Sequence, residues 1–243
     1  MTGLTNTITN NFIEIISLMG KRNVYIEWPN LIPELSKNIE SQNNVNCKLA
    51  LECVKKICKK YRFMFRSDAL YNEMNYMIES LSNELISSLI QAIQQMKAAT
   101  HVDHLVTVLG ISNSVLHIIE SILSQEELPD FYEVNLPHIT QACVEILTFS
   151  SPLLNDDKKL TALNKARGKV VRLVHLYQSK FQEHFTAYQD VFFQNIWQLA
   201  ANQQLNPNKS CETLVQAVIR YMGDCINLPN YSEFIRTNLM AFF

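Results

Sequence analysis

Glycine and proline are scarce in this chain, which has only five glycines and seven prolines among its 243 residues. These residue types form most tight turns, so their scarcity argues against a sheet-rich fold, which needs many turns. The glycines also stand far apart, at positions 3, 20, 110, 168 and 223. Neither a dinucleotide-binding fingerprint nor a phosphate-binding loop can be assembled from them, which excludes nucleotide chemistry of those two types.

An excess of charge of either sign is missing as well, because 21 basic side chains face 23 acidic ones and the formal net charge is −2. This balance gives no electrostatic reason to expect a nucleic-acid partner. The first twenty residues lack the basic start and the apolar run of a signal peptide, so we expect the six cysteines to be reduced and buried in a cytosolic or nuclear protein. The longest weakly charged stretch, 104–119, contains several polar residues and is shorter than the roughly 20 apolar residues of a membrane span. We therefore expect no membrane segment.

Apolar residues make up 47% of the chain and recur at spacings of three and four residues, which predicts helices almost throughout. Gly20 is expected to end the first helix as a C-cap, Pro29 to lie in the first turn of the second, and Asp68 to begin a long one. The expected helices cover about 4–19, a short stretch from 28, then 45–62, 68–97, 101–124, 129–149 with an interruption or kink at Pro137, 157–179, 183–202, 210–227 and 231–243.

The spacing of these helices predicts an open array. First helices of successive pairs would begin at intervals of about 39 to 61 residues, at or above the forty-odd residues of helical HEAT repeats. The helical wheels keep one polar side, which suits stacked pairs that contact only their neighbours. We therefore predict an all-α fold, a right-handed α-solenoid of antiparallel helix pairs (HEAT repeats in an ARM-type superhelix). Residues 1–243 would form a single segment of about four helix pairs with unpaired helices at each end.

The two ends of the chain suggest a piece of a longer array. Solenoids need terminal repeats with a polar outer face, yet the chain closes on an apolar run that includes Met240, Phe242 and Phe243. It also begins with a helix that has no first partner. We therefore expect the sequence to be a segment of a longer solenoid.

Residues that could support catalysis or metal binding do not assemble into a site. His101 and His104 stand three apart, but a structural zinc ion needs four ligands and no matching Cys or His motif accompanies them. Cys53 and Cys58 lie on the apolar side of their helix, where packing explains them. No Gly-x-Ser-x-Gly elbow is present, and acidic pairs fall in the connections. We expect no catalytic residue, no cofactor and no metal site, and hence no enzyme.

Positive side chains gather on two of the expected helices. If the second helices of the pairs line the concave side, both groups would face an acidic protein surface inside the curve. The alternative is that both are ordinary solvated faces, and nucleic acid is a third possibility that the charge balance disfavours. The first group is Lys48, Lys55, Lys56, Lys59, Lys60, Arg62 and Arg66, opposed by Glu52 alone, and the second is Lys165, Lys169, Arg172 and His175.

Several stretches resemble a known family. YIEWPNLIPEL resembles a helix start found early in importin-β-type transport receptors, the karyopherins. Three more stretches, CVKKICKKYRFMFRSDALYNEM, ILSQEELPDFYEVNL and AVIRYMGDCINLPNYSEFI, are similar in order and spacing to the branch of exportins that re-exports importin-α. The resemblance spans nearly the whole chain and falls in the amino-terminal arch of those receptors.

The resemblance implies a receptor that shuttles between nucleus and cytoplasm and has no enzymatic activity. It implies binding of the GTP form of the Ran GTPase together with importin-α, with nuclear pore proteins as further candidate partners and no direct contact with nucleic acid or membrane. Two alternatives stay open: another importin-β-type receptor with different cargo, and a HEAT-repeat scaffold without Ran dependence. Because such receptors clasp Ran with their inner helices, the resemblance and the second basic group together nominate Asn10, Asn11, Glu14, Lys48, Glu52, Lys55, Lys59, Lys165, Lys169 and Arg172.

Overall fold

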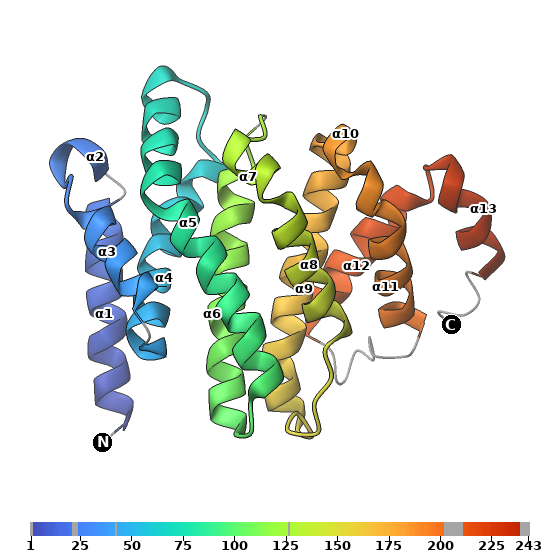
Figure 1. The fold of residues 1–243 in the computed structure, drawn as a ribbon, viewed down its shortest axis with the longest axis horizontal. Coiled ribbons are helices and arrows are strands. Elements are labelled where there is room, and N and C mark those ends of the chain that lie inside the picture. Colours follow the sequence, from blue (N-terminus) through green and yellow to red (C-terminus); the bar gives the residue numbers. More distant parts are fainter. Residues whose placement is uncertain (1, 21–23, 42, 126, 202–210, 239–243) are drawn as a thin grey trace.

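The computed structural model describes residues 2–20, 24–41, 43–125, 127–201 and 211–238, and within these ranges the chain is helical without any strand (Figure 1). The longer helices alternate in direction and are joined by short connections. In chain order the elements are α1 (Thr2–Gly20), α2 (Val24–Glu27), α3 (Leu31–Glu40), α4 (Asn44–Cys58), the 3-10 helix η1 (Lys59–Arg62), α5 (Asp68–Ala98), α6 (Val102–Ile122), α7 (Asp130–Val134), α8 (Leu136–Thr148), α9 (Asp157–Lys180), α10 (Gln182–Phe185), the 3-10 helix η2 (Thr186–Tyr188), α11 (Gln189–Ala201), α12 (Glu212–Cys225) and α13 (Pro229–Asn238).

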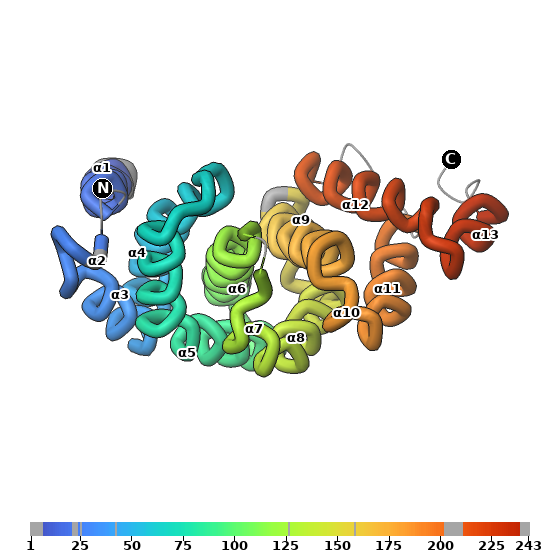
Figure 2. The backbone as a smooth tube through the Cα atoms, turned by 90° about the horizontal axis from the view of Figure 1, so that it is seen from above, coloured from blue at the N-terminus to red at the C-terminus, as the bar shows by residue number. Residues whose placement is uncertain are grey.

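The helices form two rows, each packed in chain order. The inner row consists of α1, α4, α6, α9 and α12, and each of these helices contacts the next. The outer row consists of α3, α5, α8 and α11, which also contact one another in order, and α13 joins α11 through stacked Phe193 and Tyr231. Seen from above, the double row bends so that α1 and α13, the first and last described helices, lie toward the side of the inner row (Figure 2). This arrangement confirms the predicted all-α solenoid and places the inner row on its concave side.

The core lies between the rows, and α6 is its most enclosed helix. It packs against α4, α5 and α9, and Leu105, Val108 and Leu109 are among its fully buried side chains. By length and composition alone α6 could cross a membrane. It extends beyond the weakly charged stretch 104–119, which is too short for a membrane span. Two thirds of its most apolar window, 67%, is buried inside the solenoid. Its hydrophobicity is therefore used in packing between neighbouring helices.

The helix α4 shows how local sequence sets the inner row. Asn43 caps its start, because the side-chain oxygen accepts hydrogen bonds from the backbone N–H of Val45 at 2.9 Å and of Asn46 at 3.4 Å. Its apolar side faces the core, where Val54 and Ile57 are fully buried. Because this side is buried, the polar residues of α4 lie on the opposite side of the helix.

The cysteines lie where the periodicity predicted them. All six are free, and all are buried except Cys211, which is partly exposed. Burial raises the pKa of Cys53 to about 11 and that of Cys143 to about 12. These two thiols therefore stay protonated and unreactive at neutral pH.

Of three helix boundaries predicted from single residues, the one at Pro29 differs from the prediction, and those at Asp68, expected as an N-cap or first-turn acid, and Pro137 agree with it. Pro29 does not lie in a first helical turn, because a turn in which the Leu31 N–H donates to the Trp28 carbonyl comes first and α3 begins at Leu31. Ser67 caps α5 by accepting from the Leu70 N–H at 3.2 Å, and Asp68 is the first-turn acid. The expected interruption near Pro137 is confirmed, since α7 ends at Val134 and Pro137 lies in the first turn of α8.

Two further differences concern whole segments. The single helix expected over 183–202 is broken into α10, η2 and α11. The short helix α2 was not expected at all. The expected exposure of Met240, Phe242 and Phe243 concerns residues outside the described ranges.

Gly20 lies at a close approach between helices. A Cβ atom at this position would lie 2.6 Å from Cδ1 of Ile57 and 2.8 Å from its Cγ1. Real Cβ atoms do not approach other atoms so closely, so a larger residue here would require the buried Ile57 side chain of α4 to move. The residue was predicted as a C-cap, and Gly20 is indeed the last residue of α1, but its contact with α4 is the feature that the structure explains.

Candidate partner-binding surface

The concave side carries a band of polar side chains along the inner row. At this part of the row the band consists of Lys48, Glu52 and Lys55 on α4 and Lys59 at the start of η1, which recur at every turn. They stand away from the buried side of this helix, and Lys48 and Lys59 are exposed. Lys55 and Glu52 form an ion pair at 2.5 Å. The band is therefore partly neutralised within a single helix.

The next helix of the row, α6, continues the band and touches it directly. The Ser114 hydroxyl donates a hydrogen bond to Glu52 at 2.8 Å. A Cβ atom on Gly110 would lie 3.8 Å from Cε of Lys48, so the stem of this lysine passes over the glycine. The polar band is thus continuous from α4 to α6.

Glu120, near the end of α6, joins three segments through ion pairs. Its carboxylate is 2.7 Å from a guanidinium nitrogen of Arg62 in η1 and 2.7 Å from the Lys169 ammonium in α9. Arg62 also donates to the Ser121 hydroxyl at 2.9 Å. The side chains of Lys169 and Glu120 are only 7% and 13% exposed. Each of these charges therefore depends on its partners for the stabilisation that water would otherwise give.

His117 lies one turn before Glu120, beneath this group of charges. Burial lowers the pKa of its imidazole to about 2, and four nearby positive charges add to the effect. In decreasing order of influence these charges belong to Lys169, Arg62, Lys55 and Arg172. The ring is therefore neutral at physiological pH. Four cations against the carboxylates of Glu52 and Glu120 leave this part of the concave side positively charged.

Much of the first basic group is paired inside the chain. Lys55 binds Glu52, Lys56 binds Glu14, Lys60 binds Glu73 at 2.5 Å, and Arg62 binds Glu120. In the second group Lys169 binds Glu120, and His175 contacts Asp224 of α12. Most of these carboxylates come from neighbouring elements. The groups therefore hold the inner row together as well as charging its surface.

The predicted residues consequently fall into three places. Lys55, Lys169 and Arg172 surround His117, with Lys169 buried. Asn10, Asn11 and Glu14 lie on α1 at one end of the row, all three exposed, with Glu14 paired to α4. Among the predicted residues, Lys48, Lys59 and Lys165 are exposed lysines that form no ion pair with a described residue, and Glu52 is paired with Lys55.

His117 and Glu120 were not predicted from the sequence. They are polar residues three apart in the most apolar helix of the chain, and that contrast was the available signal. No group of three or more His, Cys, Asp or Glu side chains that could hold a metal ion occurs in the described part of the chain.

Comparison with known proteins places this solenoid in a family. Exportin-2 of Dictyostelium discoideum is 26% identical over 230 residues, which cover 92% of this chain and 24% of that protein. The importin alpha re-exporter of Saccharomyces cerevisiae is 23% identical over 236 residues, which cover 96% of this chain and 24% of that protein. The chain thus spans about a quarter of the length of these relatives.

A solved structure described as the exportin Cse1 in its cargo-free, cytoplasmic state has the same fold. It matches with a TM-score of 0.82 at 23% identity, over 92% of this chain and 24% of that one. The sequence family described as Cse1 matches residues 57–241, from the end of α4 to beyond α13. Since that match covers most of the solenoid just described, the chain belongs to the Cse1 family.

Proposed function

We propose that this chain is a HEAT-repeat segment of a nuclear export receptor and that it binds Ran-GTP and importin-α on its concave side. The observation that carries the proposal is the family match over residues 57–241, together with relatives named Exportin-2 and importin alpha re-exporter. The inner row is a suitable surface, because it is curved and bears a net positive region around His117. Such a surface attracts an acidic partner and orients its approach.

The role implies a receptor that shuttles between nucleus and cytoplasm and works by wrapping proteins. The relatives' names describe transport, and we propose that this chain likewise has no catalytic activity of its own. Nuclear pore proteins would be further partners of a shuttling receptor. The exposed lysines Lys48, Lys59 and Lys165 are the first candidates for contact, while the paired Lys55 and Lys169 would act through the shape and charge of the surface.

A pull-down with the 243-residue chain tests the proposal. The immobilised chain is incubated with Ran loaded with GTP or with GDP, in the presence and absence of importin-α, and the full-length Exportin-2 of Dictyostelium discoideum serves as positive control. We expect more Ran to be retained in the GTP form, and more again when importin-α is added. If the control discriminates between the nucleotides but this chain binds both forms equally, this segment does not have the proposed role.

A further inference from the structure

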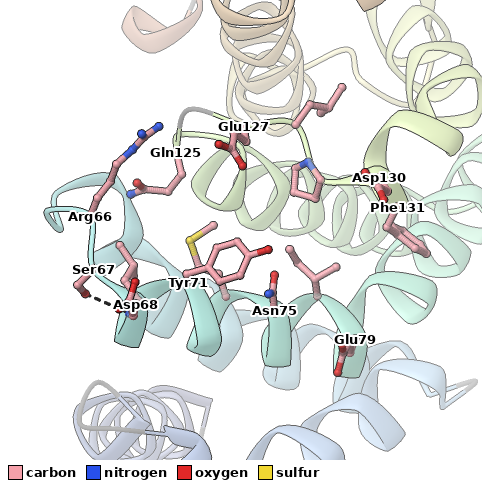
Figure 3. Close-up of a pocket in the computed structure, with 15 residues that line it drawn as sticks. Arg66, Ser67, Asp68, Tyr71, Asn75, Glu79, Gln125, Glu127, Asp130 and Phe131 are labelled. Carbon is pink, nitrogen blue, oxygen red and sulfur yellow. Dashed lines mark hydrogen bonds between the residues drawn. The ribbon is translucent and has the colours of Figure 1, made fainter.

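A groove of about 870 Å³ lies where the start of α5 faces the connection between α6 and α7 (Figure 3). One wall consists of Arg66, Ser67 and a side of α5 as far as Glu79, and the other consists of Gln125 and residues 127–131. The volume falls in the range of sites that bind small molecules or peptide side chains. The apolar lining consists of Leu70, Tyr71, Met74, Ile78, Leu128 and Phe131.

The charged side chains of this edge groove are mostly acidic. Four carboxylates, those of Asp68, Glu79, Glu127 and Asp130, line it together with the single guanidinium of Arg66. They come from both walls, and in Figure 3 the Glu127 side chain extends from the connection toward α5. None of the four makes an ion pair with another residue in the described ranges, in contrast to the paired carboxylates of the concave side. The edge groove is therefore opposite in charge to the region around His117.

The groove is formed before any partner arrives, because its second wall is held by contacts outside it. The Gln125 side chain donates to the Tyr61 carbonyl, and the Lys180 ammonium donates to the Ser124 carbonyl at 2.6 Å. Just past Phe131, the buried Tyr132 hydroxyl accepts a hydrogen bond from Ser82 at 3.0 Å. A preformed site binds without the entropic cost of ordering a loop.

Exposed apolar side chains are close in the sequence to the residues that line the groove. The three most exposed large apolar residues of the described chain are Phe65 at 95%, Phe63 at 76% and Val134 at 76%. Each lies within three residues of a residue that lines the groove. Tyr71, inside the groove, is 62% exposed. Apolar groups concentrated in this way mark a surface that another molecule covers.

We propose that the edge groove binds a short, positively charged peptide segment of a partner protein. Its lysine or arginine side chains would pair with the carboxylates on both walls, and one or two apolar side chains would insert beside Tyr71 and Phe131. An acidic peptide or a nucleic acid is repelled by the same carboxylates, and an uncharged apolar peptide would leave them unpaired. The surface is separate from the concave side, and its test involves neither Ran nor importin-α, so either proposal can fail without the other.

Fluorescence anisotropy with a labelled synthetic peptide of alternating lysine and leucine pairs tests this inference. We expect the 243-residue chain to bind it with a micromolar dissociation constant and to bind a glutamate-leucine analogue and a lysine-serine analogue about tenfold more weakly or worse. The double variant Glu127→Lys/Tyr71→Ala should weaken binding of the lysine-leucine peptide by about tenfold or more. Added salt should weaken binding to the unsubstituted chain as well.

A matched control pair separates the groove from general surface effects. Glu183→Lys on α10 and Ile219→Ala on α12 change one exposed carboxylate and one exposed apolar residue outside the groove. The double variant Glu183→Lys/Ile219→Ala should bind the peptide like the unsubstituted chain. Equal losses in the two double variants, equal binding of the glutamate-leucine peptide, or no binding at all would refute the proposal.

Photo-crosslinking tests the same proposal with the unsubstituted chain, so its result does not depend on whether a variant folds. A photoreactive leucine analogue in the peptide should label residues within 66–79 or 125–131, as found by mass spectrometry of the digest. Labelling confined to other parts of the chain would overturn the assignment of this groove.

Discussion

Glu120 is shared by two cations that come from different elements, Arg62 from η1 and Lys169 from α9. Arg62 and Lys169 both lie 2.7 Å from its carboxylate, and all three side chains are at most 20% exposed. Exposed ion pairs contribute little to stability, whereas removing one member of a buried pair leaves a desolvated charge without compensation. The contribution of Glu120 should therefore be far larger than that of a surface carboxylate such as Glu34.

Replacing Glu120 with glutamine should destabilise the chain by about 3–5 kcal/mol, because two buried cations lose their shared counter-charge. Glu34→Gln, which breaks an exposed pair with Lys37, should cost under about 1 kcal/mol. Urea unfolding followed by circular dichroism measures both. Adding Lys169→Met to Glu120→Gln should recover part of the loss, since the stranded ammonium is then gone. Similar costs for the two single variants would show that the Glu120 pairs are not desolvated in solution.

His117 predicts a pH dependence with a definite sign. Its pKa of about 2 in the folded chain lies below the ordinary value of 6.5, so the unfolded chain takes up the proton first as pH falls. The stability that His117 contributes is therefore complete above about pH 6.5 and is lost progressively toward pH 2. Between pH 7 and pH 5 the loss should be about 1–2 kcal/mol, allowing for solvent screening.

The measurement compares the unsubstituted chain with His117→Gln by urea unfolding at both pH values. The variant should lose less stability than the unsubstituted chain over this interval, by the amount just given. His138→Gln, which changes an exposed histidine on α8, is the control substitution. Parallel losses in all three proteins would mean that His117 takes up its proton without unfolding the chain.

At the level of single residues, sequence patterns predicted the polar band but not the state of its members. Lys48 and Lys169 look alike in the sequence, since each belongs to a group of basic residues on one side of a predicted helix. Only the neighbouring helix decides that Lys48 stays exposed and that Lys169 is buried against Glu120. A single-sequence wheel contains no information about such neighbours.

At the level of elements, helices with strong apolar periodicity were predicted with boundaries close to those observed. The extents of α5 and α9 are examples, and the start of α5 also carries an explicit capping residue. The break at 182–188 was missed because no proline or glycine marks it. There Phe185 stacks on both Tyr177 and Phe192, so an aromatic cluster from three helices fixes the bend. Tertiary packing of this kind overrides local propensity.

Two helix-interior glycines should respond oppositely to alanine. At Gly168 in α9 a Cβ atom would lie 3.1 Å from the Cα atom of Leu214, so α12 would have to move away. At Gly223 in α12 nothing lies within 4 Å of the new atom. Gly168→Ala should therefore destabilise the chain by about 1–3 kcal/mol, and Gly223→Ala should stabilise it by about 0.5–1 kcal/mol.

Thermal unfolding of the two glycine variants checks this pair of expectations. Both substitutions add the same methyl group to a helix, so intrinsic helix propensity favours alanine equally in each. A difference in sign can then arise only from the packing of α9 against α12. If Gly168→Ala were as stable as Gly223→Ala, the two helices could not be in the close contact described above.

At the level of the whole molecule, the curvature places exposed lysines on two different sides, the concave side and the convex side. Lys48 in α4 and Lys59 in η1 are exposed, and so are Lys37 in α3 and Lys97 in α5. The helices α3 and α5 belong to the outer row, which forms the convex side (Figure 2). Reversing Lys55 is a poor test, because a glutamate there would stand beside Glu52 and disturb the helix pair. The double variants Lys48→Glu/Lys59→Glu and Lys37→Glu/Lys97→Glu change the net charge equally on the two sides of the solenoid. The second variant also removes the ion pairs of Lys37 with Glu34 and of Lys97 with Glu145, so any loss of binding that it shows is an upper limit for the effect of charge on the outer row.

If the concave side binds Ran-GTP as proposed, Lys48→Glu/Lys59→Glu should weaken binding about tenfold, and Lys37→Glu/Lys97→Glu by no more than about twofold. Long-range attraction depends on total charge and would affect both variants alike, so a difference between them reports contact on one side of the solenoid. Binding titrations at low and moderate salt measure both effects, and the unsubstituted chain should lose more affinity with salt than the inner-row variant does. Equal weakening in the two variants would mean that the GTPase is attracted by overall charge and does not lie in the curve.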